Sequence, residues 1–316
     1  MRLRAFGRRA KSADARGMSQ QNLGWRPFRG SVAIASGLLT STELRSGRWC
    51  RLFHDVYVRA GVRITDRLLA QAALLRLPDG AVVVGRTAAQ LWGADLADSG
   101  QPIEVLAARR LEARGIQVRT GSIAADEVVT RYGVPIPTLQ HITWDLARSL
   151  PRIEAIGWID RLANRWRLST ADLVAHAETH LGEWRAAAAL EVVRRCDGRA
   201  ESPPESTIRV RLHDAGVPAP IPQWEVETAG GLFIARVDFA WPELMLALEY
   251  DGQWHADRNQ LARDRERIRR LNAAVWYVYP VTRNDLRDID RLVENVRALI
   301  RRRSRELSGN RATKGA

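Results

Sequence analysis

The chain has 316 residues, a formal net charge of +13 and only two cysteines. Its length is better divided among two or three domains of roughly 100 to 150 residues than folded around one core. Cys50 and Cys196 lie far apart, which excludes a disulfide framework or a cysteine metal cluster and is typical of thiols in a reducing cytoplasm. No apolar run approaches the roughly 20 residues that span a bilayer, so we expect a cytoplasmic protein without a membrane segment.

The positive charge comes almost entirely from arginine, because Lys11 and Lys314 are the only lysines. Guanidinium groups bind phosphate oxygens in a forked geometry, and binding to a polyanion releases condensed counterions. Nucleic acid is therefore the leading predicted partner. The alternative is an arginine-rich surface that is simply solvated.

The first predicted domain covers residues 31–100, after an extension over residues 1–30 that is expected to be disordered and contains Met18 as an alternative start. Ser41 or Thr42 can cap a short helix there. The β-rich runs Trp49–Phe53 and Val56–Arg59 predict a hairpin that turns at His54 and Asp55. Helices are expected over Ile64–Leu77 and Thr87–Trp92. This arrangement is winged-helix-like.

The stretch Leu38-Leu39-Thr40 through Gly47-x-Trp49, followed by Val56-Tyr57-Val58, is similar to the N-terminal domain of abortive-infection type IV antitoxins. The resemblance covers about a fifth of the chain. It implies DNA binding, with Thr40 to Arg48 near phosphates. The alternative is a small helical domain that only packs on its neighbours.

The middle region, residues 101–200, begins with strand-like runs over Ile103–Leu106 and Ile116–Arg119 and is otherwise expected to be α-rich. Thr138 can cap a helix over Leu139–Leu150 that Pro151 ends, and Thr170 with Asp172 can open another that runs to His180.

Four tryptophans of this region fit apolar helix faces and are predicted to be core anchors: Trp144, Trp158, Trp166 and Trp184. We interpret His141 as a surface or core histidine and not as a ligand. No chemistry is identified in the middle region.

The third predicted domain covers residues 201–306, with a disordered tail over residues 307–316. Ser202 followed by proline suits a helix N-terminus. The pattern then predicts, in order, a helix at Glu205–His213, strands at Gln223–Glu227, Phe233–Trp241 and Met245–Tyr250, a helix at Asn259–Ala273, a strand at Val275–Tyr279 and a last helix from about Asp285. The order is αβββαβα, and the chain as a whole is a multi-domain α/β protein.

Three acids mark one side of the predicted hairpin that turns at Pro242-Glu243. If Ala240 pairs with Met245, side-chain alternation places Asp238, Glu249 and Asp251 on one face. Clustered carboxylates repel one another unless a divalent cation neutralises them, which predicts a metal site. The alternative is a salt bridge of Asp238 with Arg236 or a helix arginine.

The combination of Glu205 on a helix, Arg236-Val237-Asp238-Phe239-Ala240-Trp241-Pro242, Leu248-Glu249-Tyr250-Asp251-Gly252 and His255 resembles the PD-(D/E)XK nuclease superfamily. It is most similar to the branch of very-short-patch repair endonucleases and to a set of actinobacterial domains. The resemblance implies a restriction-endonuclease-like fold and a DNA endonuclease that depends on Mg²⁺ or Mn²⁺. Asp238 would be the central metal ligand, Glu249 the second acid and Glu205 a helix-borne acid assisting them.

The superfamily's usual lysine, two residues after the second acid, is here Asp251. This departure puts catalysis in doubt. His255, which follows the acidic strand end, is the candidate for activating the attacking water, since the pKa of histidine lies near neutrality. His213 is less well placed.

Basic and aromatic residues near these acids are the candidates for contacting nucleic acid: Arg236, Arg263, Arg265, Arg267, Arg270 and Trp254. The expected function is DNA binding with a Mg²⁺-dependent endonuclease domain. The alternative is a non-catalytic regulator or antitoxin that retains the fold, with a toxin or a second copy of the chain as partner.

Overall fold

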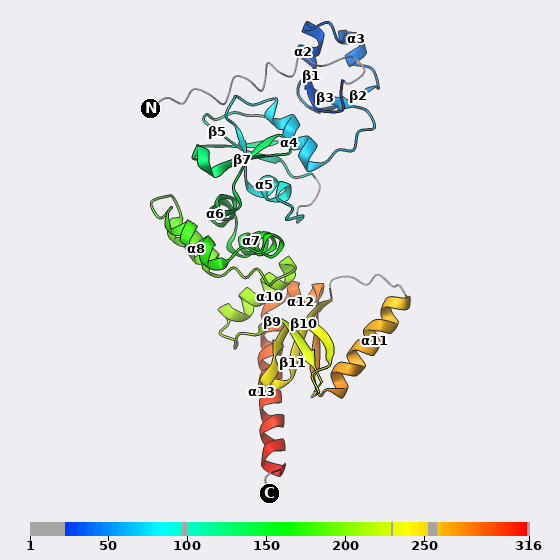
Figure 1. Ribbon diagram of the computed structural model, residues 1–316, viewed down its shortest axis with the longest axis vertical. Coiled ribbons are helices and arrows are strands. Elements are labelled where there is room, and N and C mark those ends of the chain that lie inside the picture. Colours follow the sequence, from blue (N-terminus) through cyan, green and yellow to red (C-terminus); the bar gives the residue numbers. More distant parts are fainter. Residues whose placement is uncertain (1–22, 97–99, 229, 252–257, 315–316) are drawn as a thin grey trace. The chain divides into compact units, whose positions relative to one another are not determined.

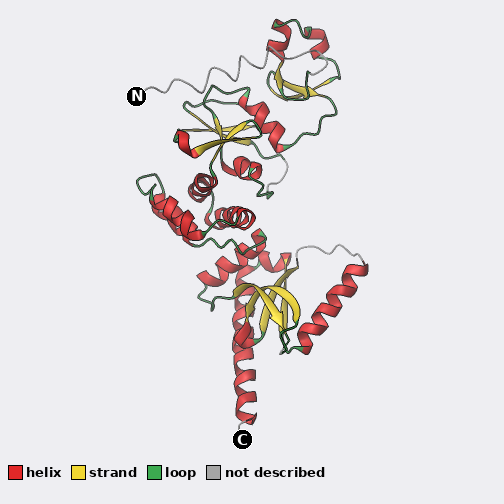
Figure 2. Ribbon diagram, viewed as in Figure 1, coloured by secondary structure: helices red, strands yellow, loops and turns green. Residues whose placement is uncertain are grey.

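The computed structural model describes residues 23–96, 100–228, 230–251 and 258–314, with side chains except those of residues 258–264 and 309–314. Helices and sheets are mixed along the whole chain (Figure 2), which is the expected α/β, multi-domain composition. The chain divides into two compact units. Unit 1 comprises Met1–Ser149 and Asp172–Ala189, and unit 2 comprises Leu150–Ala171 and Leu190–Ala316.

Unit 1 opens with a small sheet flanked by two short helices (Figure 1). In chain order the elements are β1 (Phe28–Arg29), α2 (Gly30–Ala35), α3 (Ser41–Leu44), β2 (Trp49–Phe53) and β3 (Val56–Arg59). The predicted hairpin is confirmed, and β3 lies between β1 and β2.

Two details of this sheet differ from the prediction. Thr40, and not Ser41 or Thr42, caps α3, because its side chain accepts from the amide of Glu43 while Glu43 accepts from the amide of Thr40. The fold also begins before residue 31, since Leu23 is buried and β1 pairs with β3.

A second sheet of unit 1 crosses the boundary that the sequence suggested at residue 100. Its elements, with the two helices beside it, are α4 (Asp66–Leu74), β4 (Val82–Val83), α5 (Gly85–Leu91), β5 (Ile103–Ala107) and β6 (Ile116–Thr120). β4 pairs antiparallel with β5, and β5 pairs parallel with β6. Residues on both sides of position 100 therefore share one sheet.

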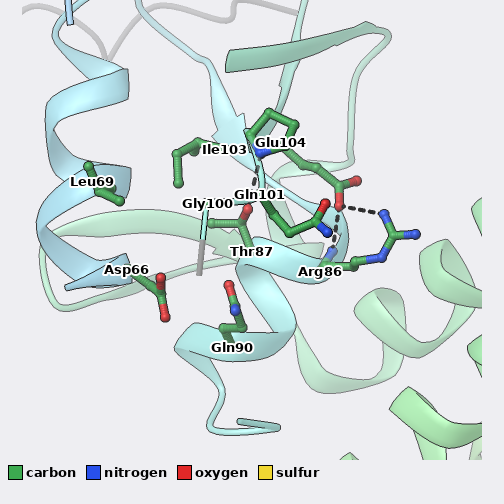
Figure 3. A pocket seen from close by; sticks show the side chains of 10 residues that line it. Asp66, Leu69, Arg86, Thr87, Gln90, Gly100, Gln101, Ile103 and Glu104 are labelled. Atoms are coloured by element: carbon green, nitrogen blue, oxygen red, sulfur yellow. Dashed lines mark hydrogen bonds and ion pairs between the residues drawn. The ribbon is translucent and has the colours of Figure 1, made fainter. Parts of the chain in front are cut away.

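The start of α5 is fixed by Glu104 of β5 (Figure 3). The Glu104 carboxylate accepts from the Arg86 amide at 3.1 Å, and the Glu104 amide donates to the Thr87 hydroxyl at 3.0 Å. A Cβ at Gly85, where φ is +60°, would overlap this carboxylate, so only glycine fits.

The rest of unit 1 carries a second hairpin and two longer helices. These elements are η1 (Ala125–Glu127), β7 (Val128–Arg131), β8 (Val134–Pro137), α6 (Leu139–Ser149) and α8 (Thr170–Glu178), with α9 (Ala186–Arg194) at the transition to unit 2. Thr138 caps α6 as predicted, since its hydroxyl accepts from the amide of His141 at 3.3 Å.

The predicted tryptophan anchors divide in two. Trp144 and Trp158 are 1% and 5% exposed, which confirms them as core residues. Trp166 and Trp184 are 38% and 74% exposed, so that prediction is wrong for them. Trp166 ends its helix, and Trp184 lies in the turn before α9, where no helix face points it inward.

Unit 2 follows the predicted element order, with the last helix in two parts. The elements are α7 (Arg152–Trp166), α10 (Pro203–Asp214), β9 (Ile221–Glu227), β10 (Phe233–Trp241), η2 (Pro242–Leu244), β11 (Leu246–Asp251), α11 (Arg258–Ala273), β12 (Tyr277–Thr282), α12 (Arg283–Arg287) and α13 (Ile289–Lys314). α13 runs through residues 307–314, where a disordered tail was expected.

The sheet of unit 2 has the order β12-β11-β10-β9, in which only β11 and β12 are parallel. Phe239, Trp241, Leu246 and Leu248 pack with apolar residues of α10 and α13. Ala240 and Ala247 belong to a second core with Leu271 of α11. The two strands are therefore covered on both faces. Within the described part of the chain, no helix is long and apolar enough to cross a membrane.

Candidate functional site

The predicted register of the β10–β11 hairpin is wrong by two residues. Ala240 pairs with Ala247, not with Met245. The turn takes up more chain than expected, because Pro242–Leu244 form a 3-10 helix and Met245 adopts a left-handed φ of 47°. A shift of two residues preserves side-chain alternation, so Asp238, Glu249 and Asp251 still belong to one face.

Continuing the observed pairings gives a polar row across three strands. Phe239 pairs with Leu248 on β11 and with Pro222 on β9, so Asp238 lies opposite both Glu249 and Gln223. Gln223 has a φ of 53°, in the left-handed region. Such backbone strain costs on the order of 1–3 kcal/mol and is concentrated at functional sites.

Glu205 joins this row from the first turn of α10, where Ser202 caps the helix. Its carboxylate accepts from the Ser202 hydroxyl at 2.6 Å, the Glu201 amide at 2.9 Å and the Gln223 side chain at 3.0 Å. Burial raises the pKa of Glu205, and the charge of Asp238 raises it further against these hydrogen bonds. Glu205 and Asp238 are therefore electrostatic neighbours, as expected for two members of one site.

Asp238 is half-buried in the middle of the row. Its Oδ2 accepts from the Tyr250 amide at 2.8 Å, and it also hydrogen-bonds Gln223. Burial raises the pKa of Asp238, while the Tyr250 hydrogen bond and the Arg267 charge act in the opposite direction. Two neighbouring acids whose ionised forms are disfavoured are typical of functional sites.

The charge of Glu249 is neutralised by Arg267 of α11. The guanidinium donates to both carboxylate oxygens, one at 2.7 Å, and also to the carbonyl of Arg236 at 2.9 Å. Among the described side chains, the predicted alternative of a salt bridge to a helix arginine is thus found at Glu249, and none is formed by Asp238. Asp251 lies exposed at the end of β11.

Of the predicted nucleic-acid contacts, Arg267 and Arg236 lie beside this site. Arg236 pairs with Glu201 at 2.9 Å, and Arg270 donates to the carbonyl of Phe233 at 2.7 Å, whereas Arg265 is exposed on α11. The side chains of Arg263, Trp254 and His255 lie outside the described residues. His213 lies beside Arg195 at 2.5 Å, on the exposed end of α10. Contacts with nucleic acid remain predictions for all six residues proposed from the sequence: Arg236, Arg263, Arg265, Arg267, Arg270 and Trp254.

The donor chemistry of the row fits a hard divalent cation, because the half-buried Asp238 and the buried Glu205 carry carboxylates whose charge is disfavoured by burial. Sequence reasoning missed Gln223 and the pairing of Arg267. The sequence signal for Gln223 is its place at the start of the predicted strand Gln223–Glu227, which directly precedes the strand that carries Asp238.

A second group of potential metal ligands lies in unit 1. Among the described His, Cys, Asp and Glu side chains, this is the group whose ligand atoms lie within reach of one ion. Its members are Glu127, His141, His176 and His180. A sequence signal existed, because His176 and His180 are four residues apart on the helix that was predicted to run to His180.

Comparison with known proteins shows that the chain is similar to two uncharacterized proteins, from two strains of Mycobacterium tuberculosis. Each is 29% identical over 248 residues, which cover 78% of this chain and 89% of the relative. No family model and no solved structure matches the chain.

Proposed function

We propose that the chain binds DNA and that unit 2 carries a Mg²⁺-dependent endonuclease site. The observation that carries the proposal is the polar row Gln223–Asp238–Glu249, joined by Glu205 from α10. Hydrolysis of a phosphodiester requires neutralisation of charge on the scissile phosphate. A cation bound between the buried Glu205 and the half-buried Asp238 would supply this neutralisation and would offset the burial that raises the pKa of both acids.

The element order and strand order of unit 2 support a restriction-endonuclease-like fold, with the acids on the two central strands. The hairpin and short helices at the start of unit 1 support a winged-helix-like module with exposed Arg45 and Arg48 beside α3. The net charge of +13 agrees with a polyanionic partner.

Each residue of the row has a separable role. Asp238 and Glu205 would hold the cation, and Gln223 keeps both carboxylates in place through its side-chain amide. When bound, Mg²⁺ would polarise the phosphate and offset the developing negative charge. Glu249 can take part only if Arg267 moves away from it, because that guanidinium now engages both of its oxygens.

The test is cleavage of plasmid DNA by the purified full-length protein with Mg²⁺ or Mn²⁺. Asp238→Asn and Glu205→Gln should lower the rate by about a hundredfold or more, as removal of one group that stabilises developing charge does. Asp290→Asn, at an exposed position on α13, is the matched control and should cleave like the parent. Equal cleavage by all four proteins would assign the activity to a contaminant.

A second candidate is a non-catalytic DNA-binding regulator or antitoxin that retains this fold. The ion pair between Arg267 and Glu249 favours it, because the protein's own guanidinium group already neutralises this acid. In addition, Asp251 stands at the position where the nuclease superfamily usually has a lysine. It predicts salt-dependent DNA binding without cleavage and no change in melting temperature with Mg²⁺ or Mn²⁺. A metal-dependent rise in melting temperature that is lost in Asp238→Asn would rule it out.

A further inference from the structure

Four potential metal ligands of unit 1 come together from three separate segments. Glu127 ends η1, His141 lies in the first turn of α6, and His176 lies in the last turn of α8. His180 follows in the turn after α8, because the helix ends at Glu178 and not at His180 as predicted. We call these four residues the His–Glu cluster. The chain contains six histidines, and half of them meet here.

The local structure holds the first two ligands next to each other. The amide of Thr138 donates to the carbonyl of Glu127 at 2.8 Å, while the Thr138 hydroxyl caps the helix that carries His141. His176 lies in the last turn of α8 and His180 lies two residues beyond its end. The His180 amide donates to the carbonyl of Ala177 at 3.1 Å, and this turn leaves the two imidazole rings 4.6 Å apart. The backbone therefore presents all four side chains to one point.

The separations between ligand atoms match those around a zinc ion. Glu127 Oε2 is 3.0 Å from His141 Nδ1, and Glu127 Oε1 is 3.3 Å from His180 Nε2 and 3.6 Å from His176 Nε2. All four ligand atoms lie within 4.8 Å of one another. Ligands at about 2.0–2.1 Å from a tetrahedral zinc are separated by roughly 3.3 Å.

Hydrogen bonding does not account for this arrangement. His141 Nδ1 and His176 Nε2 are buried and have no hydrogen-bond partner, although the Glu127 carboxylate is close to both. His141 is only 6% exposed, and its Nδ1 is closed off from bulk solvent. Buried polar atoms without a partner are costly, and a shared cation would satisfy both nitrogens at once.

The hydrogen bonding of His180 directs its Nε2 lone pair toward the cluster. Nδ1 of His180 lies 3.0 Å from the carbonyl of His176, which can only accept, so Nδ1 carries the proton and Nε2 is left as the ligand atom. Glu183 lies 3.9 Å from His180 Nε2 and is held by Trp144 and Arg148.

We propose that the His–Glu cluster binds one Zn²⁺ ion and that this ion fastens α8 to α6 and η1. Three imidazoles and one carboxylate suit zinc, whereas Mg²⁺ prefers oxygen ligands only. With four protein ligands the coordination shell is closed, which is the pattern of a structural and not a catalytic zinc. The site is independent of the acids of unit 2 and does not rest on the function proposed for them.

The first test is the metal content of the purified full-length protein, measured by elemental mass spectrometry. We expect one zinc per chain in the parent, and at least a tenfold lower content in His141→Gln and His176→Gln. The matched control is His54→Gln, an exposed histidine of unit 1 outside the cluster, which should retain zinc. Asp238→Asn should also retain it, which separates this site from the proposed nuclease site.

The second test uses the parent protein, so its result does not depend on whether a variant folds. After removal of metals with a chelator, Zn²⁺ should raise the melting temperature by several degrees and saturate at one equivalent, and excess Mg²⁺ should not replace it. Co²⁺ should give the visible absorption of a tetrahedral site. Less than a tenth of an equivalent of bound zinc together with no thermal response, or equal zinc loss in His54→Gln and His176→Gln, would overturn the proposal.

Discussion

At the scale of single residues, Asp238 stands out because its position is unfavourable for its own charge. Burial and the charge of Glu201 raise its pKa, whereas the Tyr250 amide, Arg267 and Gln223 lower it. A carboxylate whose charge is disfavoured lowers the stability of the fold, but it also provides a site that can attract a cation. The residue therefore gives a prediction that can be tested without knowing the substrate.

Asp238→Asn should raise the urea midpoint of the protein at pH 7 in chelator. An acid with a raised folded-state pKa destabilises the fold at every pH above that pKa, and the penalty disappears as pH falls toward the unfolded value of about 3.9. The gain of the variant over the parent should therefore shrink between pH 7 and pH 4. Asparagine can still accept from the Tyr250 amide, so no hydrogen bond is lost there. A gain that grew on acidification would contradict the assignment.

At the scale of elements, one side chain links a helix to two strands of the sheet. Arg267 of α11 donates to Glu249 of β11 and to the backbone of β10. The same guanidinium supplies positive charge beside Asp238. A cation bound by the acids would compete with it, so the position of α11 and the occupancy of the site are coupled.

Arg267→Gln should cost about 1.5–3 kcal/mol of stability in chelator, the usual contribution of hydrogen bonds to a charged group. Mg²⁺ should recover part of this loss, because Glu249 becomes available when the guanidinium is removed. The control is Arg269→Gln, whose exposed pair with Glu266 lies within one helix and contributes about 0.2–1 kcal/mol. Chemical denaturation with and without Mg²⁺ measures both. The same loss in both variants would show that Arg267 has no special role.

At the scale of the whole molecule, the two candidate metal sites belong to different units. The His–Glu cluster lies in unit 1 and the polar row lies in unit 2. The sites also differ in ligand type, with imidazoles in one and carboxylates in the other. Each unit should therefore respond to its own class of metal.

Hydrogen exchange followed by mass spectrometry should separate the two responses. Zn²⁺ should slow exchange in peptides from η1, α6 and α8, because it closes their shared ligand shell. Mg²⁺ should slow exchange in β10, β11 and the start of α10. His176→Gln should abolish only the first effect and Asp238→Asn only the second. Protection by Zn²⁺ in the strands of unit 2 alone would contradict the placement of the zinc site.

Local pattern was sufficient to predict several elements from the sequence. The bounds of β2, β3 and β10 are the predicted ones, because alternating apolar residues and strong turn signals define them within a few positions. The element order of unit 2 follows from the same patterns. That Asp238 and Glu249 share a face was also predictable, since alternation along a strand survives a shift of two residues.

Tertiary structure decided which residues meet. The turn at Met245 set the register, the left-handed backbone at Gln223 brought its amide to Glu205, and α11 placed Arg267 on Glu249. The His–Glu cluster depends on the packing of α6 against α8, which no local pattern specifies. Sequence determined the elements and their faces because these depend on neighbouring residues, whereas both sites depend on contacts between segments distant along the chain.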